Sequence, residues 1–132
     1  MKVGCPKEIK PQEFRVGLTP AAVNELVRRG HFVTIETNAG QGAGFVDSDY
    51  EKEGADIVGS AKEVFDKADM IVKVKEPQAI ERKMLKSGQL LFTYLHLAPD
   101  PEQTHDLIES GCTAIAYELS LIHISEPTRL AT

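Results

Sequence analysis

The sequence predicts an α/β fold with a doubly wound, mostly parallel sheet and helices on both faces. Short apolar runs of strand length alternate with helical patterns along most of the 132 residues. Each helical segment is long enough to carry the chain across the sheet, so successive strands can lie parallel in right-handed βαβ units. The length suffices for one domain with its own core.

Strand and helix signals follow one another in the first third of the chain. Residues 1–5 form an apolar run that predicts a strand. Thr19 with Pro20 predicts the beginning of a helix, because threonine caps free backbone N–H groups and proline fits the first turn. Gly30 predicts the end of that helix. Residues 31–36 alternate between polar and apolar, as a half-buried strand does.

Two short helices are predicted further along by capping boxes, in which a serine and the glutamate three residues later satisfy each other's backbone N–H groups. These boxes are Ser48 with Glu51 and Ser60 with Glu63. The other predicted elements are strands at 55–58, 68–75, 89–94 and 112–117, and a helix that begins at Asp100-Pro101 and stops at Gly111.

Composition and charge exclude several classes of function. The formal net charge is −5, and phosphate binding needs a clustered basic surface, so no nucleic-acid partner is expected. No run approaches the roughly 20 apolar residues that span a bilayer, and residues 1–6 lack the apolar stretch of a signal peptide. The expected location is therefore the cytoplasm. Cys5 and Cys112 form no metal-type pair, so buried thiols and no metal site are predicted.

The last fourteen residues, 119–132, differ in character from the rest. Residues 119–129 resemble the read-through translation of a transposase adapter used in sequencing libraries. We therefore expect a domain at residues 1–118 and a foreign tail after it, and His123 receives no functional role. The alternative is a genuine strand that ends in a turn.

Three side chains that can carry positive charge follow predicted strands. Arg15 lies in the loop after the first strand, Lys75 ends the run at 68–75, and His96 lies just past the run at 89–94. Ligands of open α/β sheets bind beyond the carboxyl ends of the strands, so these side chains predict one site for a small carboxylate. Arginine can clamp a carboxylate with two hydrogen bonds, and lysine supplies a point charge. Histidine is the natural proton donor and acceptor beside them.

Each of these residues also has an ordinary structural interpretation. A lysine at a strand end is usually a solvated charge, and so is a histidine in a loop. Arg15 could pair with Glu13 or Glu8 instead of with a ligand.

Residues 1–118 resemble the amino-terminal portion of alanine dehydrogenase throughout. The segments that carry this resemblance are Glu13-Phe14-Arg15-Val16, Leu18-Thr19-Pro20, Arg28-Arg29-Gly30-His31, Lys73-Val74-Lys75-Glu76-Pro77, residues 91–98 and residues 114–118.

The resemblance implies an NAD-dependent oxidoreductase that interconverts L-alanine with pyruvate and ammonium. It implies that Arg15 and Lys75 hold the substrate carboxylate and carbonyl, and that His96 is the catalytic acid and base. It also implies a homo-oligomer, a hexamer in relatives, and an NAD-binding domain outside these residues. We therefore expect this chain, as a truncated substrate-binding domain, to contain no cofactor-binding residues and to be inactive alone.

Two alternatives remain beside this interpretation. The alpha subunit of nicotinamide nucleotide transhydrogenase resembles the chain as well, but it has no histidine equivalent to His96 and no Lys-Glu-Pro ending like residues 75–77. A stand-alone module that binds small carboxylates through Arg15 and Lys75 is the other alternative. The choice between NAD and NADP, and the selectivity among small amino acids, stay open.

The glycine-rich residues 38–44 are not interpreted as a dinucleotide fingerprint. Phe45 occupies the position where G-x-G-x-x-G requires its last glycine, and no clear helix opens at once to face a pyrophosphate. A tight surface loop is predicted there.

Overall fold

A computed structural model describes residues 1–95, 100–116 and 130–131. Its strands are β1 Lys2–Cys5, β2 Phe32–Glu36, β3 Asp56–Val58, β4 Met70–Val72, β5 Leu90–Thr93, β6 Thr113–Ala116 and β7 Leu130–Ala131. Its α-helices are α1 Pro20–Arg28, α2 Asp47–Lys52, α3 Ala61–Lys67, α4 Ala79–Arg82 and α5 Pro101–Ser110, and a 3-10 turn, η1, covers Gln41–Ala43.

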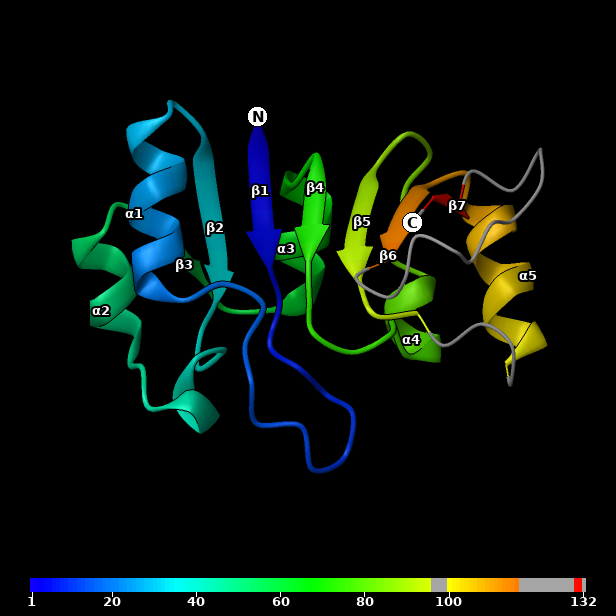
Figure 1. Ribbon diagram of the computed structural model, residues 1–132, viewed down its shortest axis with the longest axis horizontal. Helices are drawn as coiled ribbons and strands as arrows, with labels where there is room; N and C mark the ends of the chain where they lie inside the picture. The colour runs from blue at the N-terminus through cyan, green and yellow to red at the C-terminus, as the bar shows by residue number, and fades with distance from the viewer. Residues whose placement is uncertain (96–99, 117–129, 132) are drawn as a thin grey trace.

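The described strands form one sheet in the order β3-β2-β1-β4-β5-β6-β7 (Figure 1). Every neighbouring pair is parallel, so the sheet is wholly parallel. The chain starts in the middle at β1, winds outward through β2 and β3, and then returns to β4 on the other side of β1. This reversal is the mark of a doubly wound sheet, and it confirms the predicted fold class.

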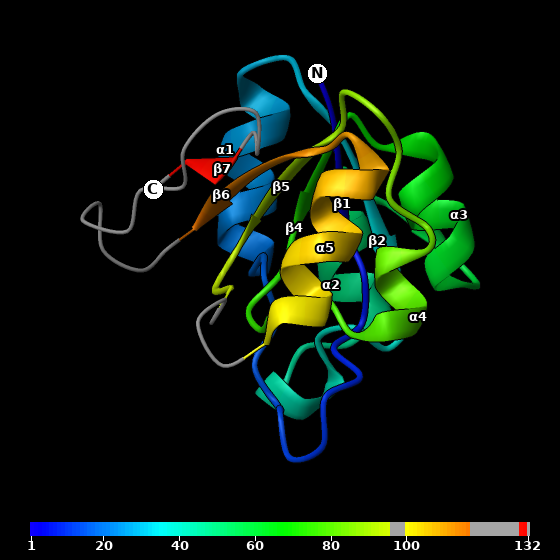
Figure 2. The same cartoon turned by 90° about the vertical axis from the view of Figure 1, so that its right-hand side faces the viewer.

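Each face of the sheet has its own apolar core. Ile71 packs in the cluster that contains Phe65 of α3 and Leu107 of α5. Its neighbour Val72 points to the opposite face, into the cluster that contains Val23 of α1 and Tyr50 of α2. Figure 2 shows α1 on one side of the sheet and α3 and α4 on the other. Burial on both faces accounts for the apolar character of these strands.

The helix boundaries follow the local chemistry that the sequence predicted in three cases. Thr19 caps α1 by accepting a hydrogen bond from the backbone N–H of Ala22 at 3.1 Å. Ser60 caps α3 in the same way, by accepting from the backbone N–H of Glu63 at 3.3 Å, which is one half of the predicted capping box, and Asp100 caps α5. At the far end of α5, Gly111 has φ 73°, a left-handed conformation that glycine adopts without strain.

Two sequence predictions about elements were wrong in detail, and one helix was not predicted. The capping box of Ser48 is not formed, because α2 begins at Asp47 and the side chain of Asp49 instead accepts from the backbone N–H of Val46 at 2.9 Å. The predicted strand at 68–75 is shorter, since β4 ends at Val72. Helix α4 was not predicted, because four residues are too few to show a helical period.

The predicted foreign tail lies mostly outside the described residues, which leave out 117–129 and 132. Its residues Leu130–Ala131 form β7, which pairs with β6 in the register Ala114 with Leu130. The origin of this segment stays a prediction.

Candidate functional site

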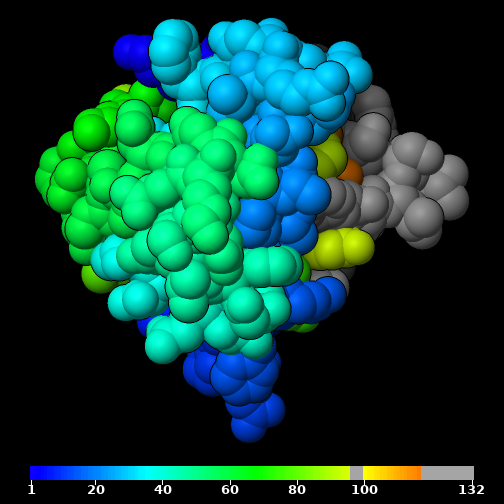
Figure 3. Space-filling model, turned by 90° about the vertical axis from the view of Figure 1, so that its left-hand side faces the viewer, coloured from blue at the N-terminus to red at the C-terminus, as the bar shows by residue number. Residues whose placement is uncertain are grey.

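The loop after β1, residues 6–19, projects from the carboxyl edge of the sheet. Figure 3 shows its dark blue tip standing out from the body of the molecule. The loop does not float free, because Gly17 lies directly against β4. A Cβ atom at Gly17 would be 2.6 Å from the carbonyl oxygen of Val72. Glycine is therefore required where this loop returns to the sheet.

Arg15 and Lys75 line one cavity of about 400 Å³ between this loop and the segment after β4. Lys75 is partly exposed there. Two other cavities also reach Arg15: one of about 330 Å³ toward Asn38 and Gln41, and one of about 350 Å³ toward Val74 and Tyr94. The geometry thus brings two of the three predicted site residues together.

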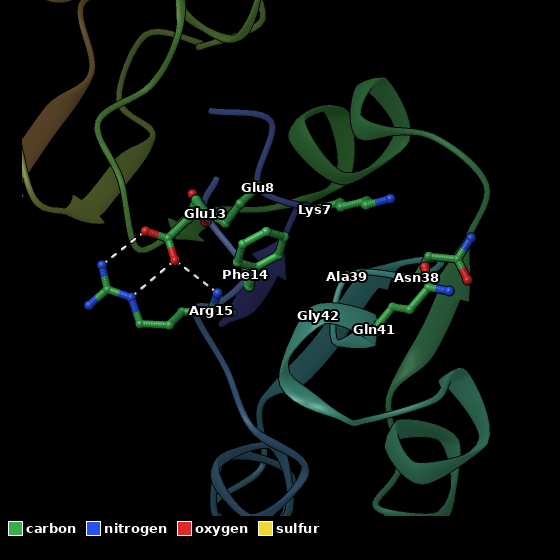
Figure 4. Close-up of a pocket in the computed structure, with 9 residues that line it drawn as sticks. All are labelled: Lys7, Glu8, Glu13, Phe14, Arg15, Asn38, Ala39, Gln41 and Gly42. Atoms are coloured by element: carbon green, nitrogen blue, oxygen red, sulfur yellow. Dashed lines mark hydrogen bonds and ion pairs between the residues drawn. The ribbon is translucent and has the colours of Figure 1, made fainter. Parts of the chain in front are cut away.

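The guanidinium of Arg15 already holds one internal carboxylate. Its Nε donates to Glu13 Oε2 at 3.0 Å and its Nη2 donates to Glu13 Oε1 at 2.9 Å, as Figure 4 shows. The backbone N–H of Arg15 also donates to Glu13 Oε2, at 2.8 Å. These hydrogen bonds lower the pKa of Glu13 to about 2, so this carboxylate is ionised at neutral pH. The pairing with Glu13 that the sequence allowed is therefore formed.

One edge of the guanidinium remains for a ligand. Glu13 occupies the edge formed by Nε and Nη2, whereas Nη1 has no hydrogen-bond partner among the described residues. The Arg15 side chain is 63% exposed. A small carboxylate can therefore bind end-on, through Nη1 and the second hydrogen of Nη2.

A second group of charges lies beneath this surface. The ammonium of Lys73 is 3.0 Å from Glu8 Oε1 and 3.3 Å from Glu81 Oε2, and all three side chains are at most 2% exposed. Burial raises the pKa of Glu81, although the charge of Lys73 opposes this shift. We refer to Glu8, Lys73 and Glu81 as the buried triad.

His96, the third predicted site residue, lies outside the described residues. The chain reaches its position from β5 through Tyr94 and Leu95. Tyr94, two residues earlier in the sequence, lines the cavity of about 350 Å³ that Arg15 also lines.

The glycine loop after β2 does not fit a dinucleotide. A Cβ at Gly42 would be 2.8 Å from the carbonyl oxygen of Phe14, and a Cβ at Gly40 would be 2.7 Å from the ring of Tyr50. Gly42 therefore allows close packing against the loop after β1, and Gly40 allows it against α2. The turn η1, which contains Gly42 and follows Gly40, is three residues long and presents no α-helix terminus to a pyrophosphate. Figure 4 shows Phe14 between Arg15 and this loop.

The described ranges, 1–95, 100–116 and 130–131, contain no cluster of three or more His, Cys, Asp or Glu side chains that could hold a metal ion. Cys5 and Cys112 are buried thiols, as predicted, and burial raises the pKa of Cys5 to about 12. None of the described helices is both long enough and apolar enough to cross a membrane.

Comparison with known sequences decides the family. Residues 4–129 match the family described as alanine dehydrogenase/PNT, N-terminal domain. The chain belongs to this family. It is 52% identical over 118 residues to an alanine dehydrogenase of Halomonas elongata. The aligned residues cover 89% of this chain and 32% of the relative. This domain thus spans about a third of the length of the curated relatives it matches.

Two solved structures, one of each kind of relative, resemble this chain. An L-alanine dehydrogenase superposes with a TM-score of 0.88 and 53% identity, over 98% of this chain and 34% of that one. A transhydrogenase from Sinorhizobium meliloti superposes with a TM-score of 0.82 and 32% identity, over 88% of this chain and 33% of that one. The fold is shared by both, and the sequence is more similar to the alanine dehydrogenase.

Sequence reasoning missed the buried triad. Lys73 and Lys75 stand in one motif, and only Lys75 was singled out. The available signal was a lysine flanked by Val72 and Val74 in an apolar run, since a charge inside a buried strand needs a partner. That partner, Glu8, is 65 residues away in sequence, and only the fold brings it close.

Proposed function

We propose that this chain is the substrate-binding domain of an NAD-dependent L-alanine dehydrogenase. The observation that carries the proposal is the shared cavity of Arg15 and Lys75, in a chain about half identical to alanine dehydrogenases. The whole protein would convert L-alanine, NAD⁺ and water into pyruvate, ammonium and NADH.

The proposed roles follow from the chemistry of each side chain. Arg15 would bind the substrate carboxylate end-on, because Glu13 occupies its other edge. Lys75 would sit beside the carbonyl and stabilise the negative charge that develops on its oxygen in the transition state. His96 would transfer the proton at the reacting centre, the role for which imidazole suits neutral pH.

NAD would supply the hydride acceptor. The described residues do not fit it, since the glycine loop packs against Phe14 and Tyr50. We therefore assign no step through the nucleotide to this chain, and propose that the nucleotide binds in the part of the enzyme that corresponds to the remaining length of the relatives. A catalytic aspartate and the nicotinamide contacts are proposed for that same part.

Binding and turnover test the proposal separately. We expect the chain to bind pyruvate in an NMR titration, and Lys75→Ala to weaken that binding. We expect no oxidation of L-alanine with NAD by the chain alone, because hydride transfer needs both reactants held in register. Absence of pyruvate binding by the folded chain would remove the proposal. Turnover that follows the protein through purification would contradict the placement of the nucleotide site.

The proton-transfer role of His96 needs the rest of the enzyme. This chain would replace the corresponding third of the Halomonas elongata relative, and NADH formation from L-alanine would be followed. We expect His96→Ala to lower the rate by roughly 10²- to 10⁴-fold while pyruvate still binds. An unchanged rate would assign the histidine a structural role.

The same resemblance leads us to propose a homo-oligomer in the cytoplasm. Analytical ultracentrifugation of the chimera tests the first part. A monomer at micromolar concentration would contradict it.

A further inference from the structure

Two lysines of one motif have opposite environments. Lys73 is 1% exposed, and its ammonium contacts two carboxylates of the buried triad. Lys75 is partly exposed, lines the cavity of Arg15, and has no ion pair among the described residues. Of these two lysines, only Lys75 therefore has a charge that is available to a ligand.

Glu8 connects the two lysines. Its Oε1 accepts from the ammonium of Lys73 at 3.0 Å and from the backbone N–H of Lys75 at 3.1 Å, and its Oε2 accepts from the backbone N–H of Val74 at 2.9 Å. Glu8 belongs to the loop after β1, whereas its three donors follow β4. One buried carboxylate therefore fixes the segment that carries Lys75 against the loop that carries Arg15.

Thr93 holds the same segment from the other side. It is the last residue of β5 and is fully buried. Its hydroxyl lies 2.8 Å from the carbonyl oxygen of Lys75 and 3.2 Å from that of Val74. A hydroxyl donates one hydrogen, so the shorter contact is its main bond. The peptide groups on both sides of the Lys75 Cα are thereby held, although β4 itself ends at Val72.

We propose that Glu8 and Thr93 are positioning residues that hold the Lys75 backbone so that its ammonium meets the substrate carbonyl. This rests on the proposed function, because Lys75 must be the group that contacts the substrate. Lys73 supports this arrangement by neutralising Glu8. Without Lys73, the carboxylate of Glu8 would be free to attract the ammonium of Lys75 away from the ligand. Neither positioning residue contacts the substrate itself.

A double-mutant cycle tests this inference on the 132-residue chain. Pyruvate affinity is measured by NMR titration for the wild type, Lys75→Ala, Glu8→Gln and the double variant. We expect Glu8→Gln to weaken binding by about tenfold when Lys75 is present and by less than twofold when it is alanine. Equal losses in both backgrounds would show that Glu8 only supports the fold, and would overturn the inference.

Thr93 provides a milder test should Glu8→Gln fail to fold. Thr93→Val removes the hydroxyl at nearly constant shape, and Thr93→Ser restores it. We expect weaker pyruvate binding in the valine variant and recovery in the serine variant. Where Glu8→Gln does fold, hydrogen exchange should accelerate at the amide of Lys75 while the amides of α5 stay protected. Unchanged affinity in Thr93→Val would overturn the role of Thr93.

The outcomes separate the two proposals. A folded wild-type chain that does not bind pyruvate contradicts the proposed function. Pyruvate binding that depends on Lys75 but responds equally to Glu8→Gln in both backgrounds contradicts only the positioning role.

Discussion

Two groups of opposite charges lie beside the same edge of the sheet and differ in their access to water. In the buried triad, every side chain is at most 2% exposed. In the surface pair of Arg15 and Glu13, the glutamate side chain is only 5% exposed but the arginine is 63% exposed, so water reaches the guanidinium. Desolvation makes a buried charge costly unless it is paired, whereas water screens an exposed pair. The buried triad therefore has a structural role, whereas Arg15 remains available for a ligand.

The largest expected effect comes from breaking the triad. Lys73→Met should lower the free energy of unfolding by about 3–5 kcal/mol, because two buried carboxylates lose their counter-charge. Denaturant unfolding measures this loss. The control is Lys73→Met with Glu81→Gln, which should recover part of it by removing one of those charges. A loss below about 1 kcal/mol in the single variant would mean that water reaches the triad.

The surface pair should respond in the opposite way. Arg15→Lys should weaken pyruvate binding by roughly 10- to 150-fold, since an ammonium cannot reproduce the two-pronged guanidinium contact. The unfolding free energy of this variant should change by no more than about 1 kcal/mol, because lysine keeps the positive charge and the side chain at this position is mostly exposed. Isothermal titration and denaturant unfolding give the two numbers. Wild-type affinity for pyruvate would exclude Arg15 from the site.

The acid titration of Glu13 sharpens the comparison further. Its pKa is lowered from 4.5 to about 2 by Arg15, so its stabilising contribution is complete above pH 4.5 and is lost as the pH falls through about 2. A carboxyl NMR titration should show this directly. In Arg15→Ala the same carboxyl should titrate near 4.5. A value near 4.5 in the wild type would mean that the pair is not formed in solution.

The smallest effect is expected away from both groups. Removal of residues 119–132 should shift the melting temperature by less than about 2 °C, because we propose that this segment is foreign to the domain. Differential scanning calorimetry measures the shift. A decrease of 5 °C or more would mean that β7 is an integral strand of the sheet.

Local signals in the sequence predicted the fold well. The caps of α1, α3 and α5 depend on contacts three residues apart, so Thr19, Ser60 and Asp100 could be assigned without tertiary information. The predicted cap at Ser48 was wrong, because a contact with a preceding loop competes with it. Asp47 accepts from the backbone N–H of Asn38 at 2.9 Å, and this contact with the preceding loop fixes the start of α2 one residue before Ser48.

The candidate site could be predicted only in its exposed part. Arg15 and Lys75 follow strands, and the topology of parallel sheets is enough to bring such residues to one edge. The supporting residues could not be found in this way. Glu8 meets Lys73 and Lys75 across 65 and 67 positions of sequence, a pairing that depends on β1 lying beside β4. No local pattern encodes that neighbourhood.

The central position of β1 has a consequence for synthesis of the protein. Within this chain β1 precedes the other described strands, and β2, about thirty residues later, can cover one of its edges. The other edge pairs with β4, whose partner residues are Met70 and Ile71. Until those residues emerge, the nascent chain carries an uncovered apolar strand edge, the kind of surface on which chains aggregate. We therefore expect chaperones to engage this domain until Met70 and Ile71 have left the ribosome.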